Sequence, residues 1–141
     1  MKRILIINSN YYKNISKNLV SSVKRRLDNT KFKLSILDVP GVYEIPISIR
    51  RNIKKFDGFI ALGCVIKGQT PHFDLICSST FNAILNMSIK FNKPISNGII
   101  TAFNLNQAKS RSNQSNSKKP NKGTEAANAI ISIFKNGPKK F

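Results

Sequence analysis

The chain has 141 residues, of which 40% are hydrophobic, a size and composition typical of one globular domain with a single packed core. It carries 24 Lys and Arg against 6 Asp and Glu, a formal net charge of +18. No apolar run approaches the ~18 residues of a membrane-spanning helix, and no small-residue cleavage site follows the apolar start. We therefore expect one cytoplasmic domain over residues 1–141, with no membrane association.

The excess of positive charge first suggests a nucleic-acid partner. The basic residues are spread over the whole chain, however, and their densest cluster is only "VKRRL". We therefore expect a solvated basic surface and no specific nucleic-acid partner. Cys64 and Cys77 have apolar neighbours and no C-x-x-C spacing, which predicts two buried, reduced thiols. With His72 as the only histidine, no metal site is expected.

The first third of the chain alternates between strand and helix patterns. Residues 3–8, "RILIIN", form a continuous apolar run typical of a strand covered on both faces. From Ser16 apolar residues recur at helical spacing to Leu27, which predicts a helix with Ser16 as its N-cap. The following segments are predicted as a strand over residues 31–39, a proline-bracketed loop over 40–46 and a helix over 47–56.

The same alternation continues to the end of the chain. Strands are predicted over residues 57–66 and 94–101, and helices over 72–91, 104–111 and 121–136. The apolar positions of the longest helix are Leu75, Ile76, Phe81, Ile84, Leu85 and Ile89. Residues 112–120 form a polar linker without periodicity, and residues 136–141 are expected to fray as a basic tail.

Regular alternation of strands and helices predicts an α/β fold of three layers, α/β/α, with a flavodoxin-like four-stranded parallel sheet and helices on both faces. In such sheets ligands bind at the carboxyl ends of the strands. The four loops expected there contain every unusual residue cluster of the chain: "SNYYKN", "PGVYEIP", "KGQTPH" and the segment after "GIIT".

The loop "KGQTPH" leads from a buried strand into the longest helix. Gly68 allows a tight turn, and backbone N–H groups around Gln69 and Thr70 at the start of a helix form a cradle suited to phosphate. His72 could transfer protons beside that cradle near neutral pH. Gly and Thr that only shape a turn, and a histidine that only packs or caps locally, are the alternatives.

The other loops allow similar pairs of interpretations. Tyr11 and Tyr12 could stack on a heterocycle or be ordinary loop aromatics. Glu44, beside Tyr43, could hydrogen-bond a polyol or favour the first turn of a helix. Arg111 ends a short helix, where most arginines are solvated or interact with the last carbonyl groups.

Taken together, four segments resemble the lumazine synthase family of riboflavin biosynthesis: "VPGVYEIP", "FDGFIALGCVIKGQTPHFD", "NKPISNGIITAFNLNQAKSR" and "NKGTEAA". They occur in family order and cover residues 39 to about 127. The resemblance implies an enzyme, a transferase, that condenses 5-amino-6-(D-ribitylamino)uracil with 3,4-dihydroxy-2-butanone 4-phosphate. It implies release of 6,7-dimethyl-8-ribityllumazine, phosphate and water, and no cofactor.

The resemblance also implies roles for individual residues. His72 matches the proton-transferring histidine, and Tyr11 stands where the family stacks an aromatic ring on the pyrimidine. The remaining matches are Val42, Tyr43 and Glu44 for the ribityl chain, Cys64, Val65 and Ile66 along the pyrimidine, Gln69, Thr70 and Arg111 for the phosphate, and Lys122 and Glu125 as a site lysine and a histidine-orienting acid.

Three positions depart from the family pattern. Tyr12 replaces a frequent Asn, Lys67 replaces a frequent Arg, and Asn97 stands where many members place an aromatic from the neighbouring subunit. The family builds its sites between subunits, so a homopentamer or decamer is implied. The polar linker between Arg111 and Asn121 is a few residues longer than in the shell-forming members, which disfavours a sixty-subunit shell. Association with riboflavin synthase is left open.

Two other classes of function remain as alternatives. A flavin- or lumazine-binding module would use Tyr11 and "PGVYE" without the phosphate and proton-transfer groups. A basic nucleic-acid binder would need none of these residues. The joint presence of Thr70, His72 and Arg111 favours the enzyme.

Overall fold

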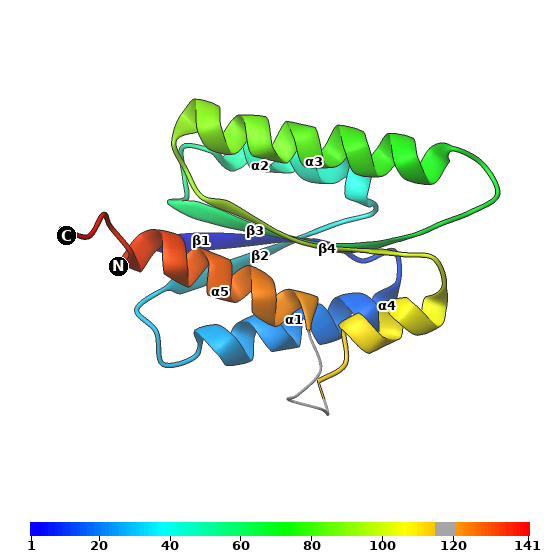
Figure 1. Cartoon of the computed structure of the whole chain (residues 1–141), viewed down its shortest axis with the longest axis horizontal. Coiled ribbons are helices and arrows are strands. Elements are labelled where there is room, and N and C mark those ends of the chain that lie inside the picture. Colours follow the sequence, from blue (N-terminus) through cyan, green and yellow to red (C-terminus); the bar gives the residue numbers. More distant parts are fainter. Residues whose placement is uncertain (115–120) are drawn as a thin grey trace.

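The computed structural model of this chain describes residues 1–114 and 121–141. Within these residues the backbone alternates between strands and helices, as Figure 1 shows. The elements are β1 (Arg3–Ser9), α1 (Lys13–Leu27), β2 (Lys33–Val39), the 3₁₀ turn η1 (Val42–Glu44), α2 (Ile45–Asn52), β3 (Gly58–Ile66), α3 (His72–Phe91), β4 (Ile95–Ala102), α4 (Leu105–Arg111) and α5 (Lys122–Lys135).

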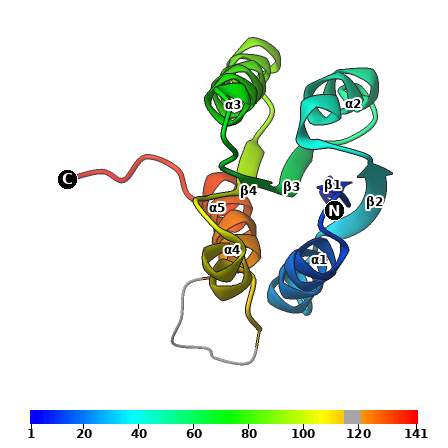
Figure 2. The ribbon, with the colours of Figure 1, turned by 90° about the vertical axis from the view of Figure 1, so that its right-hand side faces the viewer.

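The four strands form one parallel sheet in the order β2-β1-β3-β4. Helices α2 and α3 cover one face, and α1, α4 and α5 cover the other (Figure 2). Parallel neighbours need a crossover connection, and here each crossover is a helix. The predicted α/β/α fold with a flavodoxin-like sheet is confirmed.

The two central strands are buried on both sides. On one face Ile6 of β1 belongs to a cluster with Leu19 of α1 and Ile130 of α5. On the other face its neighbour Ile7 packs in a cluster with Ile49 of α2. Alternate side chains of a strand point to opposite faces, so a strand covered on both sides is apolar at every position. This is why the first strand reads as an uninterrupted apolar run.

The predicted start of the first helix is wrong. Helix α1 begins at Lys13, and its N-cap position is Tyr12, whose side chain makes no capping bond. Ser16 lies inside the helix, where its buried hydroxyl donates to the carbonyl of Ser9 and, at 3.0 Å, to Asn8 Oδ1. Ser16 therefore ties α1 to the end of β1 instead of capping the helix.

The predicted boundary between loop and helix after β2 is also wrong. Helix α2 starts at Ile45, directly after η1, and ends at Asn52, four residues earlier than predicted. Pro46 occupies its first turn, where a missing N–H costs no helical hydrogen bond. A proline read as the end of a loop is thus the start of a helix.

The remaining predicted elements agree with the structure to within two residues, and α3 has the predicted bounds. Residues 115–120 of the predicted polar linker lie outside the described residues. Residues 136–141 are exposed and belong to no helix or strand. Among the described residues, no helix combines the length and hydropathy needed to cross a membrane.

Candidate active site

Three of the four loops at the carboxyl ends of the strands line one open hollow of about 560 Å³, which we call the His72 hollow. Its lining consists of Ser9, Tyr11, Tyr12, Gly41, Val42, Tyr43, Cys64, Val65, Ile66, His72 and Ile76. Eight of these eleven lining residues were given a possible role from the sequence, and the exceptions are Ser9, Gly41 and Ile76. The carboxyl ends of β1, β2 and β3 lie at one edge of the sheet, which brings their loops together.

Three lining residues, Ser9, Gly41 and Ile76, were given no role from the sequence. Gly41 adjoins Val42, which was given a role. Ile76 follows His72 by one helical turn on α3, so helical spacing places both on the same face. Ser9 precedes Tyr11 by two residues, at the end of β1. Spacing could have found Ile76 and Ser9 once the helix and strand were assigned.

Two tyrosines, Tyr11 and Tyr43, present exposed rings at the His72 hollow. The rings of Tyr11 and Tyr12 meet edge to face, with centroids 5.0 Å apart. Burial raises the pKa of Tyr12, and the neighbouring Cys64 and Tyr11 raise it further. Tyr12 is thus a neutral phenol at neutral pH, while the face of Tyr11 is suited to contact a flat heterocycle.

Strand β3 contributes its last three residues to the floor of the hollow. Cys64 is buried, and burial raises the pKa of its thiol to about 11. The thiol is therefore protonated at neutral pH and is not a nucleophile. Cys77 on α3 is only half-buried, so the prediction of two buried thiols is wrong for this residue. Burial and, to a lesser extent, the nearby Asp74 raise the pKa of Cys77 as well.

The loop from β3 to α3 is exposed at Gly68, Gln69 and Thr70. The backbone N–H of His72 donates to Thr70 Oγ1 at 3.4 Å. His72 is exposed and begins the 20-residue helix α3, whose first N–H groups and dipole favour an anion at this end. Gln69 and Thr70 adjoin the His72 hollow along the chain but do not belong to its lining.

Glu44 lies beside the hollow at the end of η1. Its backbone N–H donates to the carbonyl of Gly41 at 3.2 Å. A Cβ atom at Gly41 would lie 3.0 Å from Glu44 Oε2, so the carboxylate folds back over this glycine. The absence of a side chain at position 41 thus lets Glu44 sit next to the lining of the hollow.

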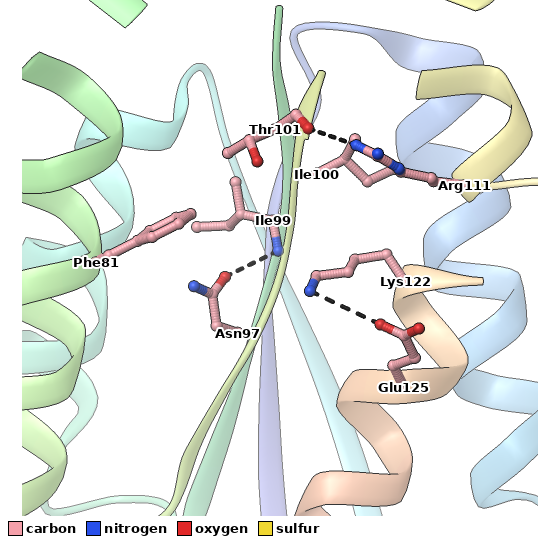
Figure 3. Close-up of a pocket in the computed structure, with 8 residues that line it drawn as sticks. All are labelled: Phe81, Asn97, Ile99, Ile100, Thr101, Arg111, Lys122 and Glu125. Atoms are coloured by element: carbon pink, nitrogen blue, oxygen red, sulfur yellow. Dashed lines mark hydrogen bonds and ion pairs between the residues drawn. The ribbon is translucent and has the colours of Figure 1, made fainter. Parts of the chain in front are cut away.

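A second hollow, of about 200 Å³, surrounds the outer edge of β4, and we call it the Arg111 hollow. Its lining is Phe81, Asn97, Ile99, Ile100, Thr101, Arg111, Lys122 and Glu125 (Figure 3). Phe81 and Asn97 lie on the α3 side of the strand, and Lys122 and Glu125 lie on the α5 side.

The polar groups of the Arg111 hollow are partly engaged with one another. Arg111 Nη1 donates to the carbonyl of Thr101 at 2.6 Å, which leaves the other guanidinium donors directed into the hollow or to solvent. Lys122 Nζ lies 3.7 Å from Glu125 Oε2. Asn97 Oδ1 accepts a hydrogen bond from the N–H of Ile99 at 3.0 Å, so its amide NH₂ group points away from the strand.

The comparison with known proteins identifies the family. The family model described as 6,7-dimethyl-8-ribityllumazine synthase matches residues 1–136. This chain belongs to that family. The 6,7-dimethyl-8-ribityllumazine synthase of Campylobacter curvus (strain 525.92) is 35% identical to this chain over 138 residues. The match covers 94% of this chain and 86% of that relative. The relative of the same name in Campylobacter jejuni (strain RM1221) is 37% identical, and the match covers 94% of this chain and 87% of the relative. The one in Bartonella tribocorum (strain CIP 105476 / IBS 506) is 33% identical, and the match covers 94% of this chain and 89% of the relative.

In this member of the lumazine synthase family, most of the residues with implied roles are divided between two hollows, and Glu44, Gln69 and Thr70 line neither. His72 and Tyr11 line one, whereas Asn97, Arg111 and Lys122 line the other. Within one chain, Arg111 and the Gln69–Thr70 loop, with which it would share a phosphate, line no common hollow. Within residues 1–114 and 121–141, His, Cys, Asp and Glu form no group of three or more able to hold a metal ion.

Proposed function

We propose that this chain catalyses the 6,7-dimethyl-8-ribityllumazine synthase reaction at a site shared by two subunits, with the His72 hollow of one subunit facing the Arg111 hollow of the next. The observation that carries this proposal is the division of the implied site residues between two open hollows of a single chain. Neither hollow alone holds both a proton-transfer group and the phosphate-pairing arginine.

The His72 hollow would bind 5-amino-6-(D-ribitylamino)uracil. The exposed face of Tyr11 suits stacking on the pyrimidine, and the backbone at Cys64–Ile66 suits its polar edge. Tyr43 and Glu44 lie where they could hydrogen-bond the hydroxyls of the ribityl chain. The neutral thiol of Cys64 leaves this floor without a charge, which suits an uncharged heterocycle.

The Arg111 hollow of the neighbouring subunit would complete the site for 3,4-dihydroxy-2-butanone 4-phosphate. The N–H groups at Gln69, Thr70 and the start of α3 would hold the phosphate from one side, and Arg111 from the other. The amide of Asn97 would offer a hydrogen-bond donor where the family often places an aromatic ring. Lys122 and Glu125 would complete the polar wall.

The chemistry needs protons moved at each step. The amine of one substrate attacks the ketone of the other, water leaves, phosphate is eliminated and the ring closes. His72 begins α3 at the edge of its hollow, where it could move protons at these steps. Holding two substrates in register can itself lower the barrier by roughly 7–11 kcal/mol, so orientation would supply most of the catalysis.

The surface of the chain supports assembly into a ring. Of the apolar residues of α3, only Ile84 is buried, while Leu75, Leu85 and Ile89 are 64%, 59% and 72% exposed. Among the residues that the structure describes, none forms a strand on the outer edge of β4. Exposed apolar helix faces of this kind mark protein interfaces. We propose that the chain forms a pentamer or decamer. We also propose that it is located in the cytoplasm, where free thiols such as Cys64 and Cys77 stay reduced.

Mixing two impaired variants, assayed with the butanone phosphate well below the KM of Arg111→Ala, tests the shared site. One variant combines Tyr11→Ala with His72→Ala, and the other is Arg111→Ala. In a closed ring with head-to-tail contacts, random assembly of equal amounts leaves about a quarter of the sites with both halves intact. Co-expressed chains should therefore form lumazine, measured by its fluorescence above the uncatalysed rate, at about a quarter of the wild-type activity.

The outcome discriminates between a shared site and one within a single chain. A mixture whose activity equals the average of the two variants measured alone contradicts the shared site. Arg111→Lys mixed with wild type provides the matched control, because it keeps the charge and changes only one half of the site. No lumazine from the folded wild-type oligomer would refute the proposed reaction altogether.

A further inference from the structure

Positive charge is concentrated at the end of the molecule opposite the two hollows. Strands of the sheet start at this end and the helices α1, α2, α3 and α5 finish there; both chain termini also lie at this end in Figure 1. We call this end the basic pole and define it as residues 1–3, 24–33, 50–57, 90–94 and 134–141. It holds 16 of the 24 Lys and Arg residues but only Asp28 and Asp57 among the 6 acids.

Interactions within the fold offset only part of this positive charge. Each helix C-terminus carries about half a negative charge, so the four helices together attract roughly two positive charges. Among the described residues of the pole, the ion pair is between Arg3 and Asp57, at 3.8 Å. Lys93 is half-buried and donates to the carbonyls of Ile53 and Phe56. The other Lys and Arg side chains of the pole are exposed.

The side chains of the pole are better suited to bind phosphate groups than to bind an apolar surface. The only large hydrophobic side chains that the five segments expose are Met1 and Phe141, so nothing within them resembles an apolar face that inserts into lipid. Asn29 and Asn92, both exposed and in the left-handed conformation that ends a helix, add amide donors between the cations. Lys, Arg and Asn are among the side chains that contact nucleic-acid phosphates and sugars.

We propose that the basic pole binds the phosphodiester backbone of single-stranded nucleic acid, without recognising its bases. Its charge is spread over the ends of four helices, the starts of the strands and the C-terminal tail, which extends from this end in Figure 1, and a flexible single strand can follow cations spread in this way. Such binding releases counterions, and the logarithm of the affinity falls with the logarithm of salt by about 0.7 for each phosphate contacted.

Binding at the pole is independent of the proposed reaction. The hollows lie at the carboxyl ends of the strands, and the pole lies at their amino ends, so an oligonucleotide at the pole leaves both hollows open. Product formation should thus be unchanged when the pole is saturated. This separates the two proposals, because failure of either leaves the other standing.

Two triple variants of equal charge test the location. The pole variant carries Lys31→Gln, Lys54→Gln and Lys55→Gln, and the matched control carries Lys13→Gln, Lys17→Gln and Lys109→Gln at the other end of the molecule. All six lysines are exposed. Binding of a fluorescent 20-nucleotide oligouridylate is measured by anisotropy between 50 and 200 mM salt, with the full oligomer. Should the pole variant not fold, Lys139→Gln with Lys140→Gln in the exposed tail takes its place.

We expect the wild type to bind with a salt slope of about −3 or steeper, as contact with several phosphates requires. The pole variant should bind at least tenfold more weakly at 50 mM salt, with a slope shallower by up to about 2, and the control should change less than threefold. Equal weakening of both variants would show that net charge alone is responsible and would overturn the proposal. So would inhibition of lumazine formation by the oligonucleotide, or binding to phosphatidylserine vesicles by a protein that does not bind the oligonucleotide.

Discussion

Replacing Gly98 by alanine should loosen the contact between β4 and the layer of α5. Gly98 pairs with Leu62 of β3, and an added Cβ would lie 2.6 Å from Leu62 Cδ2. It would also lie 3.0 Å from Ala126 Cβ of α5 and 3.0 Å from the carbonyl oxygen of Ala61. Leu62 is 0% exposed and Ala126 2%, so neither has open space into which to move.

The magnitude follows from the movement that these contacts require. Carbon atoms pack at about 3.5–4.0 Å, so Leu62 Cδ2 or the α5 layer would have to shift by about 1 Å. Overpacking of this kind costs about 1–3 kcal/mol. Alanine offsets about 0.5–1 kcal/mol of it, because glycine is the less favourable residue inside a strand. We expect Gly98→Ala to lower the free energy of unfolding by about 1–2 kcal/mol, and Tm by roughly 3–8 °C.

Urea unfolding followed by circular dichroism, at one fixed protein concentration, measures this loss. Because α5 begins with Lys122 and carries Glu125, its displacement should also reduce lumazine formation. Gly137→Ala is the matched control, since nothing lies within 4 Å of a Cβ at that position. A Gly98→Ala protein as stable as the Gly137→Ala control would refute the packing argument.

Three further outcomes are expected. Arg111→Ala should raise KM for the butanone phosphate by about 10- to 100-fold, as loss of a charged hydrogen bond predicts, and should lower Tm only slightly, because the lost bond to the Thr101 carbonyl is exposed; a rise in KM only for the ribitylaminouracil would contradict the assigned role. His72→Ala should lower kcat by about 100-fold or less, because orientation of the substrates remains; a kcat equal to that of the wild type would exclude proton transfer by this residue. The raised pKa of Cys64 means that the folded chain keeps this proton at pH values where the unfolded chain has lost it, so the free energy of unfolding should fall as pH rises from 9.0 to about 11. Cys64→Ala should show a smaller fall in urea unfolding over that range, and an identical fall would rule out this thiol as the cause.

Sequence periodicity predicted the elements well where apolar residues follow a regular pattern. It predicted them poorly where a single serine or proline near a helix start has more than one possible role. The apolar run of β1 and the pattern of α3 gave bounds close to those observed. Ser16 was misread because a serine near a helix start usually caps it, whereas here its hydroxyl bonds back to β1. Pro46 was misread because a proline suits both a loop and the first turn of a helix.

By itself, the sequence determined the class of fold and the family. Continuous apolar strands alternating with amphipathic helices allow little besides a parallel sheet with two covered faces, and the loop motifs carry the family resemblance. Only the tertiary structure decided which loops meet. The order β2-β1-β3-β4 brings the first three loops into the His72 hollow and leaves β4 at the edge with the Arg111 hollow. Strand order depends on pairing between segments far apart in the chain, which local periodicity does not encode. The same folding brings cations that are scattered along the sequence to one end of the molecule.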